Sequence, residues 1–475
     1  MSEPKRLHPA TIIFNLINNV KDMFFLFVLA FVTLVNIDIL YAILAVVVLS
    51  VLLIVTSYIS WKRFTYRVGG DELKLEYGVI IRKKRYISKN RIQSIDLTQN
   101  ILHRIFKLVK VEIETAGTGK EAEASLNSVT FVEGEELRSE LKSTITEKEP
   151  VEELEEEKQI PTVTITRKRL ILTGATSGSI GVLLAVAGAA FSELVRFIPT
   201  NFYDSAYTWL VGLGIVIMAL MALGGILSLW LLGIAGVMLK YWNFTIARVD
   251  EDIVIRCGLL EKKLITIPLK RIQAVGYVEN LIRQPFGYVT VIAEIAGGSN
   301  EKGEDFSTVL FPIMKKKEVD EFLTKLLPQY RPDDAELIQL PKRSLKYYLV
   351  RAAIIPLLVL GVVLYMFPQF AWIPSVVFVL SVLLGILQYK DSAYHVTGNK
   401  LLIRYRNFNK VTMMLYHKRI QAFNKKQHIL HKRENLATIQ LSIVGKMGQG
   451  KHYHVKELDV KDADTLADWY SYRGG

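Results

Sequence analysis

The chain has 475 residues, of which 51% are hydrophobic, and a formal net charge of +13. Its mean hydropathy of +0.26 is too high for an ordinary soluble protein of this length and indicates membrane spans. The single cysteine, Cys257, excludes a disulfide framework within the chain. A basic excess on a membrane protein more often marks cytoplasmic flanks than nucleic-acid binding.

Six apolar stretches pair into three hairpins along the chain. Each stretch is predicted to be a helix, because lipid offers the backbone no hydrogen-bond partners. The first stretch begins near Met23 without a following cleavage site, so we do not expect a cleaved signal peptide. The stretches cover residues 23–37 and 39–59, 178–198 and 209–239, and 350–367 and 372–388.

Basic residues flank every hairpin on both sides, while the hairpin tips carry almost none. The exception is Arg196, which lies close to Glu193 and is expected to pair with it. By the positive-inside rule, both termini and all long connections are predicted to lie in the cytoplasm. The flanking residues are Lys5, Arg6, Lys21, Lys62, Arg63, Arg67, Arg167, Lys168, Arg169, Lys240, Lys342, Arg343, Lys346, Arg351 and Lys390.

Each hairpin is followed by a segment in which apolar and polar residues alternate at the period of a β-strand. A turn glycine follows at Gly78 in the first copy and at Gly258 in the second, whereas the third has Arg406 there and must turn differently. Each segment ends in a predicted helix, over residues 135–145, 316–327 and 461–472. Short strands closed by one helix predict a small α+β or capped-barrel module.

The string Arg-Ile-Gln occurs at the same place in all three modules. Aligned on it, residues 61–117, 241–297 and 389–445 match without a gap, and a branched apolar pair follows each string at a fixed distance. The chain is therefore an internal triplication of one hairpin and one module. The pairs are Ile101-Leu102, Leu281-Ile282 and Ile429-Leu430.

These features divide the chain into seven parts. Residues 147–158 carry seven acids and two bases, which predicts a solvated linker between the first two repeats. The predicted parts are residues 1–60, the N-terminal segment with hairpin 1; 61–146, module 1; 147–160, the acidic linker; 161–240, hairpin 2; 241–332, module 2; 333–388, hairpin 3; and 389–475, module 3.

A transmembrane hairpin followed by a strand-rich module with an Arg-Ile-Gln string resembles bacterial membrane proteins with pleckstrin-homology-like (PH-like) domains of the second bacterial class. The threefold architecture carries this resemblance over nearly the whole chain. The resemblance implies two near-orthogonal antiparallel sheets capped by a C-terminal helix in each module. It also implies action beside a smaller, single-module relative in the same membrane, in envelope stress or antimicrobial tolerance, and it supplies no catalytic residues.

The candidate binding residues are the arginine and glutamine of each string. An arginine presents a planar donor fork that suits an anionic headgroup or a carboxylate of a peptide. The alternative is that these side chains satisfy backbone groups or a buried carboxylate within the fold, and a residue kept in all copies suits either role. The candidates are Arg91, Gln93, Arg271, Gln273, Arg419 and Gln421.

Basic clusters in the modules suit an anionic cytoplasmic leaflet, where each cation contributes about 1 kcal/mol. They also suit a plain solvated face. Nucleic-acid binding is not expected, because aromatic residues do not interleave with them. The clusters are Arg82, Lys83, Lys84 and Arg85; Lys262 and Lys263; and Lys425, Lys426, Lys432 and Arg433.

No enzymatic motif is recognisable, so no catalytic residue, cofactor or metal site is predicted. The segment from Gly117 to Lys120 lacks the spacing of a phosphate-binding loop, and G-x-S-x-G and H-E-x-x-H strings are absent from the sequence. The histidine pairs His428/His431 and His452/His454 have neither cysteine nor acid at ligand spacing.

We therefore expect a non-enzymatic, multi-pass plasma-membrane scaffold with six spans and three cytoplasmic PH-like modules. Its expected partners are the lipid bilayer, anionic headgroups and a protein. The alternative is a six-span transporter or channel, which would place charged residues near the membrane midplane. The apolar stretches carry few ionisable residues, and the repeats share one topology rather than an inverted one, which disfavours the alternative.

Overall fold

The computed structural model describes residues 3–35, 38–115, 124–142, 161–177, 188, 192, 214–296, 307–331, 336–445 and 450–471. The chain divides into two compact units. Unit 1 comprises Met1–Gln159 and Val254–Pro268, and unit 2 comprises Ile160–Ile253 and Leu269–Gly475. The predicted acidic linker, the Glu193/Arg196 pair and nearly all of the apolar stretch 178–198 lie outside the described residues.

Among the residues that the structure describes, four helices are long and apolar enough to cross a membrane: Ile39–Arg63, Ala219–Lys240, Lys342–Met366 and Trp372–Asp391. They correspond to α2 (Ile39–Arg63), α8 (Gly214–Lys240), α10 (Leu345–Met366) and α11 (Trp372–Asp391). Helix α1 (Thr11–Val35) packs against α2 and begins in a more polar segment than predicted. The count of six spans stays a prediction.

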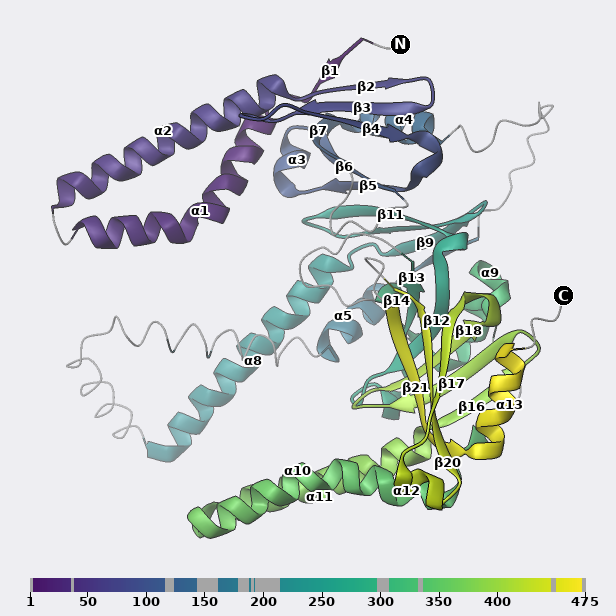
Figure 1. Cartoon of the computed structure of the whole chain (residues 1–475). Helices are drawn as coiled ribbons and strands as arrows, with labels where there is room; N and C mark the ends of the chain where they lie inside the picture. The colour runs from purple at the N-terminus through teal and green to yellow at the C-terminus, as the bar shows by residue number, and fades with distance from the viewer. Residues whose placement is uncertain are drawn as a thin grey trace. The chain divides into compact units, whose positions relative to one another are not determined.

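Two hairpins are visible among the described residues, α1 with α2 and α10 with α11 (Figure 1). Helix α2 begins where the Asp38 carboxylate accepts a hydrogen bond from the Leu40 backbone N–H at 2.9 Å, which satisfies one of the open donors of the first turn. Lys62 and Arg63 occupy its last turn, where cations complement the helix dipole.

Unit 1 holds the strand-rich module of the first repeat. One sheet contains β1 (Lys5–Arg6), β2 (Thr65–Gly69), β3 (Glu72–Tyr77) and β4 (Lys83–Ser88), in that order. To the other, this unit contributes β7 (Ala124–Thr130), β6 (Leu108–Thr115), β5 (Ile92–Gln99), β11 (Lys262–Pro268) and most of β10 (Asp252–Cys257), in that order. Helix α4 (Phe131–Lys142) buries Leu137 and Leu141 in the core between the sheets, beside Leu73 and Val111. The short helix α3 (Ile101–Ile105) links β5 to β6.

Unit 2 holds a seven-stranded antiparallel sheet and a three-stranded sheet. The larger runs β14 (Ser307–Lys315), β13 (Tyr288–Ile295), β12 (Ile272–Glu279), β18 (Lys410–Tyr416), β17 (Lys400–Arg406), β16 (Ala393–Thr397) and β15 (Ile338–Gln339). The smaller runs β19 (Ile420–Lys426), β20 (Leu436–Val444) and β21 (Gly450–Asp459). The shorter elements of this unit are β8 (Thr162–Thr164), α5 (Arg167–Ala175), β9 (Thr245–Val249), α9 (Val319–Leu326) and α12 (Ile429–Arg433).

The C-terminal helix of each module forms close to its predicted place. Helices α4, α9 and α13 (Val460–Ser471) start at residues 131, 319 and 460, where 135, 316 and 461 were expected. The third module also turns differently after its second long strand, as predicted. Gly78 and Gly258 have positive φ angles of 119° and 103°, and a Cβ there would collide with a backbone oxygen, whereas Arg406 has no positive φ.

Strands of successive repeats pair with each other, which the sequence did not predict. Strand β11 of the second repeat pairs with β5 of the first, and β18 of the third pairs with β12 of the second, both antiparallel. Lys262 stands opposite Gln99, and Lys410 stands opposite Glu279. These residues correspond in the repeat alignment, so the two junctions have the same register.

Candidate anion-binding site

A basic cavity of about 320 Å³ lies in the third repeat, where the helices of its hairpin meet the module. Its walls come from α10, α11, β17 with the following loop, and β21. No carboxylate is among the lining side chains. They are Tyr348, Arg351, Gln388, Ser392, Arg404, Tyr405, Arg406, Asn407, His452, Tyr453, His454, Val455 and Lys456.

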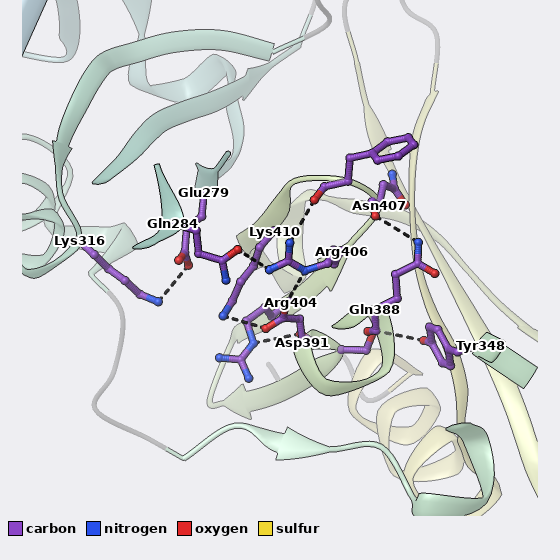
Figure 2. Close-up of polar contacts among 12 residues, drawn as sticks. Glu279, Gln284, Lys316, Tyr348, Gln388, Asp391, Arg404, Arg406, Asn407 and Lys410 are labelled. Carbon is purple, nitrogen blue, oxygen red and sulfur yellow. Dashed lines mark hydrogen bonds and ion pairs between the residues drawn. The ribbon is translucent and has the colours of Figure 1, made fainter. Parts of the chain in front are cut away.

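The cations of this cavity differ in how far they are already neutralised. The Arg406 side chain is buried and donates to the Asp391 carboxylate at 2.5 Å, and Lys410 pairs with the same carboxylate at 2.9 Å. Arg404 donates from Nε to the backbone oxygen of Asp391 at 3.0 Å, which satisfies one edge of its guanidinium but not its charge (Figure 2). Arg404 and Lys456 are therefore the cations best suited to an incoming anion.

Two lining groups have lowered pKa values, with burial as the largest cause and neighbouring cations as a further one. Burial lowers the pKa of the Lys456 ammonium, and the charge of Arg351 lowers it further, against the opposing effect of Glu457. Burial also lowers the pKa of His454, together with the charges of Lys456 and Lys426. Such shifts follow when cations share a partly desolvated site, and a bound anion would reverse them.

Phenol and hydroxyl groups lie beside these cations, and Ser392 and Tyr453 already donate to the Gln388 backbone oxygen at 2.7 Å and to Glu294 at 3.0 Å. The Tyr348 hydroxyl donates to Ser392 Oγ at 3.2 Å. The rings of Tyr405 and Tyr453 lie 6.4 Å apart. Burial, with the nearby Glu294 carboxylate, raises the pKa of Tyr405 to about 12, so this phenol keeps its proton at neutral pH. The cavity thus combines cations with the protonated Tyr405 phenol, groups that suit a phosphate or carboxylate.

Contacts between the module and both helices of the hairpin hold the cavity at the ends of these helices. On α10, Arg351 pairs with the buried Glu457 of β21, and Tyr347 donates to the backbone oxygen of Leu430 at 3.1 Å; just before α10, Arg343 pairs with Asp459. Glu457 has a left-handed backbone, with φ of 54°, at an irregularity in the β20–β21 pairing.

On α11, Gln388 donates to the backbone oxygen of Asn407 at 3.1 Å (Figure 2). Together with the α10 contacts, this hydrogen bond ties the module to the membrane hairpin, so the cavity is placed by the ends of two apolar helices.

A second recurring feature joins each module to a helix that lies before or within its own hairpin. The residue directly after the branched apolar pair makes this contact in every repeat. His103 stacks on Phe14 of α1 with ring centroids 4.2 Å apart. Arg283 donates to the Thr173 backbone oxygen at 3.1 Å and to Thr176 Oγ1 at 2.8 Å. His431 meets Tyr347 of α10 edge-on, with ring centroids 4.8 Å apart. We call 103, 283 and 431 the clamp position.

The predicted Arg-Ile-Gln residues have different surroundings in the three repeats. Arg91 is exposed and Gln93 half-buried, whereas Arg271 is buried and donates from Nε to the Ala296 backbone oxygen at 2.9 Å. Gln273 is also buried and donates to the Arg271 backbone oxygen at 3.1 Å.

In the third copy, Arg419 is half-buried and its charge acts on Tyr330, while Gln421 is exposed. None of the six residues lines the basic cavity.

Sequence reasoning missed most of the cavity because its cations come from distant elements. Arg351 was noticed only as a flanking charge, and Arg404 and Lys456 carried no signal. The basic run 82–85 lies instead along exposed β4. Among the residues that the structure describes, no group of three or more His, Cys, Asp or Glu side chains could hold a metal ion.

Comparison with known proteins agrees with the threefold repeat. The model of the bacterial PH domain matches three times, at residues 24–145, 183–330 and 346–474. A protein of Bacillus subtilis (strain 168), the UPF0699 transmembrane protein YdbT, is 35% identical over 99% of both chains. Each match of the family model spans both hairpin and module, as the repeat analysis predicted. The chain is therefore a membrane protein of the bacterial PH domain family.

Proposed function

We propose that this protein is a non-enzymatic membrane scaffold whose third repeat holds the headgroup of an anionic lipid at the cytoplasmic surface. The observation that carries the proposal is the basic cavity itself. It has Arg404 and Lys456 among its lining cations, no lining carboxylate, and walls formed by the ends of α10 and α11.

Position and charge both favour a lipid headgroup over a soluble anion. The basic flanks Lys342, Arg343, Lys346 and Lys390 lie at the same end of the hairpin, and positive flanks favour the cytoplasmic side. Anionic lipids are enriched on that leaflet, and each cation near it contributes about 1 kcal/mol of attraction. A cavity of about 320 Å³ is large enough for a phosphate with part of its glycerol.

The scaffold role follows from having several modules on one membrane anchor. Weak contacts made by separate modules of one chain add up, because the first contact raises the effective concentration for the next. The exposed Arg91 and Gln421 stay candidates for contact with a protein partner. Arg271 and Gln273 suit a role within the fold, because their side chains already donate to backbone oxygens.

Native mass spectrometry of the purified full chain, titrated with phosphatidylglycerol or phosphatidylcholine, tests the headgroup site. We expect retained phosphatidylglycerol on the wild type and at least a tenfold loss in Arg404→Gln/Lys456→Gln. The matched control is Lys461→Gln, which removes an exposed cation from α13, away from the cavity. Equal retention by the double variant and the control, with both proteins folded, would refute the proposal.

A further inference from the structure

The pairing between successive repeats leaves one strand at each end of the series without a partner repeat. Strand β5 accepts β11, and β12 accepts β18, but β19 of the third repeat pairs only with β20 among the described residues. At the other end, β4 of the first repeat lies at the edge of its sheet. Strands of successive repeats are therefore paired at two junctions. In the described residues, β4 at one end of the series and β19 at the other pair with no strand of another repeat.

Corresponding residues are buried in the joined strands and exposed in the open ones. Gly276 and Gln273 of β12 are buried under the joined strand, whereas the corresponding Asn424 and Gln421 of β19 are exposed. Most of β18 is buried, while Lys83, Lys84, Arg85 and Tyr86 of β4 are exposed. The β19 edge thus has the position of a junction strand, with Gln421, Asn424, Lys425 and Lys426 exposed. From α13, Tyr470 stacks on Phe423 and Asp464 pairs with Lys425.

A second copy of this chain does not suit the β19 edge. In the register shared by both internal junctions, residue 410 stands opposite 279 and residue 262 opposite 99. The same register would place Lys83 of a second copy opposite Lys426, and Lys84 opposite Lys425. Like charges directly opposite each other destabilise an antiparallel pair. The internal junction instead sets Lys410 opposite Glu279.

We propose that the β19 edge of the third repeat accepts a β-strand from a different protein, with acidic residues opposite Lys425 and Lys426. The shared register also determines which positions of the partner strand stand opposite the other residues of β19. In the β12–β18 junction, Met414 and Leu415 stand opposite Val275 and Ala274. The partner strand therefore carries apolar residues opposite the corresponding Phe423 and Ala422, and its main chain extends the sheet.

This inference deepens the scaffold part of the proposed function and is independent of headgroup binding. Lysines on an open strand can also serve only to prevent edge-to-edge association. That alternative predicts an edge that rejects acidic and basic strands alike. The two are separated by measuring whether pairing occurs in the expected register.

Disulfide trapping on the full chain in detergent provides the test. The protein carries Cys257→Ser and Asn424→Cys. The probe is the synthetic peptide Lys-Glu-Glu-Cys-Met-Leu-Tyr, which follows β18 with acids opposite Lys426 and Lys425 and its thiol opposite position 424. A peptide with lysines in place of both glutamates is the matched control. We expect at least tenfold faster trapping of the acidic peptide, and the reverse preference in Lys425→Glu/Lys426→Glu.

Three results would overturn the proposal. The first is equal trapping of both peptides. The second is equally fast trapping when the peptide thiol is moved by one position, or when the protein thiol is Lys461→Cys on α13, because charge attraction alone would then explain the reaction. The third is efficient crosslinking between Asn424→Cys on one copy and Arg85→Cys on another, which would make a second copy the occupant. Phosphatidylglycerol retention measured on the same variants shows separately whether the headgroup site is intact.

Discussion

The Arg-Ile-Gln string keeps its sequence in all three repeats but occupies three environments, whereas the clamp position changes its residue and keeps its contact. Arg91 is exposed, Arg271 is buried against a backbone oxygen, and Arg419 is half-buried. At the clamp position, His103 and Arg283 differ in chemistry, yet each holds a helix that lies before or within its own hairpin.

A residue that is present in all three repeats therefore need not have the same role in each, and different residues can make the same contact. The clamp position needs a side chain that reaches a neighbouring helix from a fixed backbone site, and stacking or hydrogen bonding both meet that need. The arginine of the string sits where β5, β12 and β19 begin, and the partner of each strand differs. Its surroundings therefore change although its sequence does not.

The largest expected effect is at the clamp of the second repeat. Arg283 donates to Thr176, to Thr290 at 2.6 Å and to the backbone oxygens of Thr173 and Pro312. Arg283→Ala removes all four hydrogen bonds, and of their acceptors the Pro312 backbone oxygen still accepts from Thr290 Oγ1 at 2.9 Å, so we expect a loss of about 3 kcal/mol in the free energy of unfolding. Chemical denaturation of the full chain in detergent measures it.

Arg283→Lys is the informative companion variant. It keeps the charge but not the fork of donors, and we expect it to recover only part of the loss. Wild-type stability in Arg283→Ala would show that the contact is incidental.

The next effect compares two arginines of the repeated string. Arg271→Ala removes a buried donor to the Ala296 backbone oxygen, and we expect a cost of about 1–2 kcal/mol. Arg91→Ala removes an exposed side chain, and we expect less than about 0.5 kcal/mol. Thermal unfolding of the two variants side by side measures the difference. Equal losses would mean that the string has one structural role in both repeats, against the burial that separates them.

The sequence predicts what is local and periodic in this molecule. Uninterrupted apolar runs make α2, α8, α10 and α11 recognisable, and alternation marks strands such as β20. Pairing between repeats is not predictable in this way, because it depends on which strand lies opposite. A signal was nevertheless present: β4 carries Lys83-Lys84-Arg85 where β18 has Val411-Thr412-Met413. The contrast holds between β4 and β18 but not for every joined strand, because the joined β11 begins with Lys262 and Lys263.

The basic cavity escapes sequence reasoning for a related reason. Arg351, Arg404 and Lys456 come from α10, β17 and β21, which meet only after the module has packed on its hairpin. Motif spacing cannot show such a site.

A smaller effect is expected from pH at the clamp of the first repeat. Burial lowers the pKa of His103 below its ordinary value of 6.5, against the hydrogen bond to the Asn127 backbone oxygen, which raises it. The unfolded chain then binds more protons than the folded chain in this range, so stability rises with pH. We expect the contribution of the neutral His103 ring to the stability of the fold to be complete above about pH 6.5 and to be lost below it. Denaturation of unit 1 from pH 5 to 8, the ordinary titration range of histidine, measures the slope, and His103→Gln should flatten it.

The smallest effect is expected at the clamp position of the third repeat. Stability should again rise with pH, but the Glu457 carboxylate opposes the lowering of the histidine pKa. Burial lowers the pKa of His431, and the charges of His428 and Arg351 act in the same direction, while Glu457 raises it. The His431 ring lies 3.9 Å from the Glu457 carboxylate, so protonation is partly compensated. We therefore expect a shallower loss of stability below pH 6.5 than at His103. In Glu457→Gln the opposing charge is gone, and the slope due to His431 should steepen, as comparison with Glu457→Gln/His431→Gln would show. An unchanged slope would place Glu457 outside the titration of this clamp and leave burial as its main determinant.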